Sequence, residues 1–283
     1  MRIQSTLTIA FLSSLFLAAC NTDTKKTEQK TTSDSTKSVT PGATKTKDSS
    51  TSTAMPESGF TNKAEAKNQL VNGLQEGKWI EYFDSLKWKP TKDSNNASNY
   101  ILAIYKHGKR DGLVRWYYMN NMPFHETTYK DGKADGMSKA YFKTGKVRAE
   151  YPFTQDKENG LEKQYYPTGI IRRETPYTND HIDGIVKDYY EDGKLQSETP
   201  CVHDTVEGIR KEYAEAGNVT REASFRSGRE NGTWKEYYDN GTLKQLSIFL
   251  NGQKVDEKNY TEAGAEITDP KKEHHKIPHK EAK

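Results

Sequence analysis

A glycine recurs every 24 residues along most of the chain, and this period constrains the fold more than any other feature of the sequence. The glycines that mark the period are Gly112, Gly136, Gly160, Gly184, Gly208 and Gly232. The fifth residue after each is always tyrosine, at Tyr117, Tyr141, Tyr165, Tyr189, Tyr213 and Tyr237. The sixth residue is aromatic at Tyr118, Phe142, Tyr166, Tyr190 and Tyr238, and is alanine only at Ala214. Positions within a unit are therefore numbered along the sequence from the glycine that opens the unit, which is position +0.

Other positions of the unit are restricted as well. Position +9 is glycine or asparagine, +11 is mostly apolar, +14 is mostly glutamate, and +17 is aromatic except at Cys201. An earlier copy starts at Gly77 and carries an insertion of 11 residues, which we place within residues 86–97. A partial copy follows at residues 251–264. The sequence therefore predicts a domain of seven repeats plus a partial one over residues 68–265.

The pattern within a unit predicts two short strands joined by turns. Residues +1 to +6 suit a strand, the glycine at +9 suits a tight turn, and +10 to +17 suit a second strand. Alternation predicts the apolar +11 and +17 on one face of the second strand, with +12 and +14 on the other. A single hairpin cannot bury its own apolar face, so neighbouring units must stack. We expect an all-β fold: an elongated meander of tandem antiparallel hairpins in a single twisted sheet.

The spacing G-x-x-x-x-Y-Y-x-x-G, followed by an apolar residue and a glutamate, resembles the bacterial variant of the MORN repeat (membrane occupation and recognition nexus). Residues 160–169 illustrate it. The resemblance covers residues 72–265 and implies a non-catalytic repeat protein. Some bacterial members of this family carry an antitoxin label.

The N-terminus resembles that of a bacterial lipoprotein. Arg2 precedes an apolar stretch at residues 7–19, which is too short to cross a bilayer, since a spanning helix needs about 20 residues. The stretch ends in Leu17-Ala18-Ala19-Cys20, which resembles a lipobox. We predict a signal peptide at residues 1–19 and a diacylglyceryl group on Cys20, with a further acyl chain such as palmitate on the amino group. The alternative is an ordinary secretory signal with an incidental cysteine.

The segments that flank the repeats are polar. Residues 21–60 are rich in Thr, Ser and Lys and contain almost nothing that could form a core. We predict a disordered, lipid-anchored tether at residues 20–67 and a disordered polar tail at residues 266–283. Asn21, rather than Asp, follows the cysteine. By resemblance to enterobacterial lipoprotein sorting, this implies the outer membrane as the part of the bacterial cell envelope that holds the chain.

The composition excludes several other functions. Acidic and basic residues balance over residues 61–265, whereas a nucleic-acid-binding surface needs a positive excess. With Cys20 acylated, Cys201 has no disulfide partner, and we expect it to replace an aromatic core residue. His274, His275 and His279 lie in a lysine-rich tail without a cage of further ligands, so we predict no metal and no cofactor. Potential catalytic residues are spread evenly over the units, which argues against an enzyme.

Two candidate surfaces follow from the repeat. The +5 tyrosines and the +0 glycines are expected to be structural, whereas the +6 aromatic residues, Tyr118, Phe142, Tyr166, Tyr190 and Tyr238, could bind a partner. The basic +3 and acidic +14 residues could form a charged face. We expect a membrane-anchored scaffold that binds an unknown envelope protein or a glycan. The alternatives are an antitoxin or immunity protein, and a structural envelope component without a discrete ligand.

Overall fold

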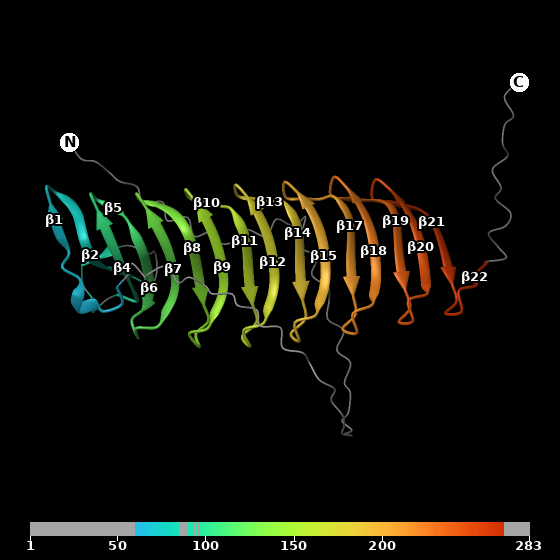
Figure 1. The fold of residues 1–283 in the computed structure, drawn as a ribbon, viewed down its shortest axis with the longest axis horizontal. Coiled ribbons are helices and arrows are strands. Elements are labelled where there is room, and N and C mark those ends of the chain that lie inside the picture. The colour runs from blue at the N-terminus through green and yellow to red at the C-terminus, as the bar shows by residue number, and fades with distance from the viewer. Residues whose placement is uncertain (1–59, 85–89, 93, 96, 269–283) are drawn as a thin grey trace, which may run out of the picture.

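The computed structural model describes residues 60–84, 90–92, 94–95 and 97–268. The described residues form one elongated sheet of 22 strands in which strands that are close in sequence lie side by side (Figure 1). The predicted all-β meander is therefore confirmed. The predicted signal peptide, Cys20 and residues 21–59 lie outside the described residues. No helix in the described ranges is long and apolar enough to cross a membrane.

The elements have the following bounds. They are η1, a 3-10 helix (Lys63–Glu65), and the strands β1 (Gln69–Val71), β2 (Leu74–Phe83), β3 (Pro90–Thr91), β4 (Asn99–Lys106), β5 (Lys109–Arg110), β6 (Gly112–Tyr118), β7 (Pro123–Lys130), β8 (Lys133–Tyr141), β9 (Val147–Thr154), β10 (Lys157–Glu158), β11 (Gly160–Tyr165), β12 (Ile171–Thr178), β13 (His181–Ile182), β14 (Gly184–Tyr189), β15 (Leu195–Val202), β16 (Thr205–Val206), β17 (Gly208–Tyr213), β18 (Val219–Arg226), β19 (Arg229–Tyr237), β20 (Leu243–Leu250), β21 (Gln253–Tyr260) and β22 (Glu266–Ile267).

Each unit is an antiparallel hairpin, as the period predicts. In the unit that starts at Gly160, β11 pairs with β12, with Lys163 opposite Glu174. The same β12 then pairs with β14 of the next unit, where Glu174 lies opposite Lys187. Every internal second strand therefore joins its own unit to the following one. The stretch in which we place the insertion of the first copy falls between β2 and β4, and part of it lies outside the described residues.

A β-bulge at the start of each second strand changes one predicted face. Between Gln164 and Tyr165 the register shifts, so Tyr165 lies opposite Ile171 and Gln164 lies opposite Arg173. Cross-strand partners in an antiparallel pair point to the same face. Position +11 is therefore on the same face of the sheet as the +5 tyrosine. Position +17 is on the other face. The prediction that +11 and +17 share a face is wrong, because the bulge adds one residue and inverts the alternation.

Consecutive units are joined by a two-residue turn, which stacks on the turn before it. Asn179 and Asp180 have φ values of 51° and 73°, as a type I′ turn requires. The Asp180 amide donates to the carbonyl of Glu158, and the Glu158 amide donates back to the Asp180 carboxylate at 2.7 Å. Asp156 and Asp204 form the same pair of bonds with the preceding unit. The short strands that carry these turns, such as β13, were not predicted.

The two faces of the sheet differ in burial. The core face carries positions +2, +4, +15 and +17, and it holds the cluster of Val186, Cys201 and Val206. Cys201 is only 2% exposed, so it does occupy the core position expected for it. The open face carries positions +1, +3, +5, +14 and +16, most of which are half-buried or exposed in the central units.

The N-terminal end is covered on both faces. Phe60 packs with Tyr100, Leu102 and Tyr117 on the open face, while Ile101 and its neighbours are buried on the core face. The predicted boundary of the tether at residue 67 is therefore wrong, since Phe60 and η1 are already part of the folded end. A single aromatic residue in a polar stretch gave no periodic signal.

The C-terminal end differs from the prediction as well. Glu266 and Ile267 form β22, which pairs with Tyr260 and Asn259 of β21. The predicted tail therefore begins at least two residues too early, because the partial unit starts a second strand. The rest of that tail, residues 269–283, lies outside the described residues.

Candidate binding surface

Hydrogen bonds between neighbouring units run along the open face. Each +5 tyrosine of the central units donates its hydroxyl proton to the +14 glutamate of the preceding unit. These bonds join Tyr165 to Glu150 at 2.7 Å, Tyr189 to Glu174 at 2.8 Å, Tyr213 to Glu198 at 2.9 Å and Tyr237 to Glu222 at 3.0 Å. The +5 row therefore connects adjacent hairpins, from the open face rather than from the core face.

The basic +3 side chains complete this row. Lys139 Nζ lies 3.7 Å from the Glu150 carboxylate, and Lys211 Nζ lies 3.6 Å from that of Glu222. Burial, and then the hydrogen bond to Glu174, raise the pKa of Tyr189 to about 12. The phenol therefore remains a neutral donor. We name this row of Lys, Glu and Tyr side chains the polar ladder; its geometry indicates a structural role first.

The +6 aromatic residues also link units, through the backbone. The hydroxyl groups of Tyr166, Tyr190 and Tyr238 donate to the carbonyls of Tyr189, Tyr213 and Tyr260 in the next unit, at 2.8, 2.7 and 2.9 Å. Phe142 has no hydroxyl and is half-buried. Tyr118 is 39% exposed, with its ring 4.6 Å from that of Phe124. Three of these hydroxyl groups are therefore already used in hydrogen bonds within the sheet. Binding of another molecule by the +6 row stays a prediction.

A row of exposed aliphatic side chains, which we did not predict, lies at position +1 of the open face. Met137, Leu161, Ile185 and Ile209 are 39%, 41%, 49% and 53% exposed. Three of them lie opposite prolines at position +16, in the pairs Met137–Pro152, Leu161–Pro176 and Ile185–Pro200. We name these seven residues the aliphatic ridge. A signal was available, since +1 is aliphatic in five of the six units opened by Gly112 to Gly232.

Three segments of the array match the family model described as MORN repeat variant, at residues 158–179, 182–200 and 230–251. Each segment contains hairpin strands with the geometry above. These three segments are therefore similar to MORN repeat variants, and the other units share their 24-residue period. No curated protein matches the chain.

Some of the opening glycines are required by close packing between units. Gly184 has φ of +130°, and a Cβ atom there would come within 2.9 Å of Pro176 Cγ in the preceding unit. A side chain at this position would have to displace a ridge proline. The packing therefore gives Gly184 a structural role.

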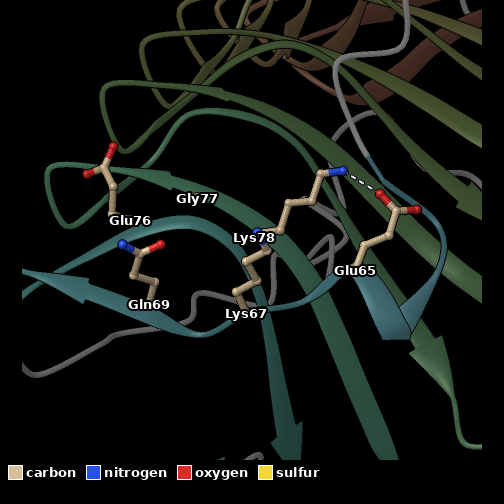
Figure 2. A pocket seen from close by; sticks show the side chains of 6 residues that line it. All are labelled: Glu65, Lys67, Gln69, Glu76, Gly77 and Lys78. Atoms are coloured by element: carbon tan, nitrogen blue, oxygen red, sulfur yellow. Dashed lines mark hydrogen bonds and ion pairs between the residues drawn. The ribbon is translucent and has the colours of Figure 1, made fainter.

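A shallow hollow lies at the N-terminal end of the array (Figure 2). It is lined by Glu65, Lys67, Gln69, Glu76, Gly77 and Lys78. Lys78 forms an ion pair with Glu65, as Figure 2 shows, and Glu76 accepts a hydrogen bond from the His107 amide. Most of the lining residues are exposed. We therefore regard the hollow as solvated surface of the folded end.

One MORN unit places carboxyl groups where its neighbours place apolar side chains. Glu162 occupies +2 and is 6% exposed, whereas the next unit has Val186 there. Burial, together with Glu162 and Asp180, raises the pKa of Glu158 to about 7. Within the described ranges, no group of three or more His, Cys, Asp or Glu side chains is arranged to hold a metal ion. Ionisation of Glu158 in this acidic pair therefore lowers the stability of the folded chain.

Proposed function

We propose that this chain is a repeat scaffold that binds a protein partner through the aliphatic ridge. The observation that carries the proposal is the exposure of four aliphatic side chains at one repeat position, in consecutive units. Contiguous exposed apolar surface of this kind is a feature of protein interaction sites. The polar ladder runs beside the ridge, so the surface combines an apolar centre with a polar margin, as protein interfaces do.

The spacing of the ridge supports a long partner segment. Successive aliphatic residues of the ridge are two inter-strand spacings apart, which is about 10 Å. The four of them therefore span about 30 Å. A helix of about 20 residues has that length. A protein partner is favoured over a glycan because the exposed groups are aliphatic, while the hydroxyl groups of the +6 tyrosines are used within the sheet.

Attachment to a membrane is the second part of the proposal. The motif Leu17-Ala18-Ala19-Cys20 motivates it, and the lipid would hold the scaffold at the cell envelope. Labelling cells with an alkyne fatty acid tests it: wild type should be labelled and Cys20→Ala should not. Equal labelling of both would exclude lipidation at Cys20.

Capture of a partner from solubilised envelope tests the ridge. The double variant Leu161→Ser with Ile185→Ser should lose a partner that wild type retains. Leu250→Ser with Val255→Ser is the matched control, because both residues are at least as exposed but lie outside the ridge. Retention by the ridge variant, or loss from both variants alike, would contradict the proposal.

A further inference from the structure

His181 and His203 lie beside each other where the turns of two adjacent units stack. Their ring centroids are 5.7 Å apart, with 37° between the ring planes. His181 opens β13, and His203 is the first residue of the next type I′ turn, with φ of 45°. Both residues are exposed. Turn stacking therefore brings two accessible imidazole rings together from different units.

Asp204 holds one of these rings in place. Its Oδ1 accepts the Ile182 amide at 2.7 Å, and its Oδ2 lies 2.7 Å from His181 Nδ1. An ionised carboxylate can only accept, so His181 Nδ1 is the donor. The lone pair of the neutral ring is then on Nε2, which is free to bind a ligand.

We propose that His181 and His203 together bind a late first-row divalent cation such as Cu²⁺ or Zn²⁺. Imidazole nitrogen suits these ions, and a carboxylate that orients the ring from its other nitrogen is the usual support of a metal-binding histidine. Asp204 has this supporting position and is not itself a ligand. Water completes the coordination, so the site binds more weakly than structural zinc sites, which use four protein ligands.

His107 provides a control within the same chain. It occupies the first position of a type I′ turn, with φ of 52°, and its Nδ1 lies 3.5 Å from a carboxylate oxygen of Glu76. No ring contact in the described part of the chain joins it to another histidine. His107 therefore reproduces the turn, the exposure and the nearby carboxylate without the second imidazole.

Isothermal titration with CuCl₂ and with ZnCl₂ tests the site. All variants are made in the full chain, in a background in which His274, His275 and His279 are replaced by alanine, so that tail histidines cannot contribute. His181→Ala and His203→Ala should each weaken binding by more than tenfold, and Asp204→Asn by about tenfold. His107→Ala should bind like the background chain, and MgCl₂ should give no binding.

Two further results keep the test decisive. The three alanine variants should unfold at the same temperature without metal, because all three side chains are exposed. In the background chain, Cu²⁺ should broaden the ring NMR signals of His181 and His203 before that of His107. Unchanged affinity in His181→Ala and His203→Ala, or equal broadening of all three rings, would overturn the proposal.

Discussion

The N-terminal end and the central units are stabilised in different ways. At the N-terminal end, Ile101 and Leu102 are completely buried on opposite faces of β4, each within its own apolar cluster. In the central units, Val186, Cys201 and Val206 form a small cluster on the core face alone. There the open face carries the polar ladder and the ridge. One end of the array therefore resembles a small globular core, whereas the middle is a thin sheet.

In the middle of the array, hydrogen bonds between units replace apolar burial. The tyrosine–glutamate bonds, the +6 hydroxyl bonds and the turn contacts all cross a boundary between units. Such an array behaves as a chain of nearest-neighbour couplings. Substitutions in the two regions should therefore differ both in size and in how far their effects spread.

The largest effect should come from Leu102→Ala. The side chain is completely buried between β2 and β6, so its truncation should lower the free energy of unfolding by about 2–5 kcal/mol. Urea unfolding of the purified chain measures this. Ile185→Ala, on the exposed ridge, should stay within about 0.5 kcal/mol of wild type. Similar losses in both variants would remove the distinction between the two regions.

A smaller and more local effect is expected from Tyr165→Phe. The change removes the hydroxyl bonded to Glu150 and should cost about 1 kcal/mol, because the carboxylate remains partly solvated. Amide hydrogen exchange should speed up around β9 and β11 and stay unchanged around β4. If exchange in β4 accelerates equally, the ends and the middle unfold as one unit, and the nearest-neighbour description fails.

The pH dependence of stability should identify the unit with the buried acidic pair. The pKa of Glu158 is raised from 4.5 to about 7 in the folded chain. Below 4.5 the carboxyl group is protonated in both states; as the pH rises to 7 the unfolded state ionises more readily. The free energy of unfolding should therefore fall between pH 4.5 and 7, by at most about 1.4 kcal/mol per pH unit for one proton.

Glu158→Gln removes this proton, so the difference between its unfolding free energy and that of wild type should grow over the same pH range. Burial lowers the pKa of His125 to about 4, so this residue makes the free energy of unfolding rise with pH. The contribution is the same in both chains and cancels in the difference between them. Glu191→Gln, at an exposed turn, is the matched control and should give a flat difference. A flat difference for Glu158→Gln would show that this carboxyl group ionises as it does in the unfolded chain.

The smallest effect is expected from Lys163→Ala. Lys163 shares the open face with Tyr165, where it is half-buried. Its replacement should change the free energy of unfolding by no more than about 0.5 kcal/mol. Thermal unfolding beside Tyr165→Phe checks the ranking. A cost equal to that of Tyr165→Phe would mean that the lysines, rather than the tyrosine bonds, hold the ladder together.

The repeat could be predicted from the sequence because its period, its turn glycines and the length of its strands all indicate the same hairpin. The bulge could not, since the extra residue, Arg172 in one unit, has no fixed chemical character across the copies. Phe60 was missed because its partners, such as Tyr100, are distant in sequence. The hydrogen bonds of Tyr166 and Tyr190 depend on where the next unit lies, which alternation within one strand cannot reveal.

The stacked turns set a rule for how such a chain can change in length. Each central unit forms the same bonds with the unit before it as the following unit forms with it. Duplicating one 24-residue segment would recreate an existing junction and lengthen the molecule by about 10 Å. Insertions of other lengths would shift the following strands out of this register. The reach of the protein can therefore evolve in whole steps, with each step adding one more copy of every surface.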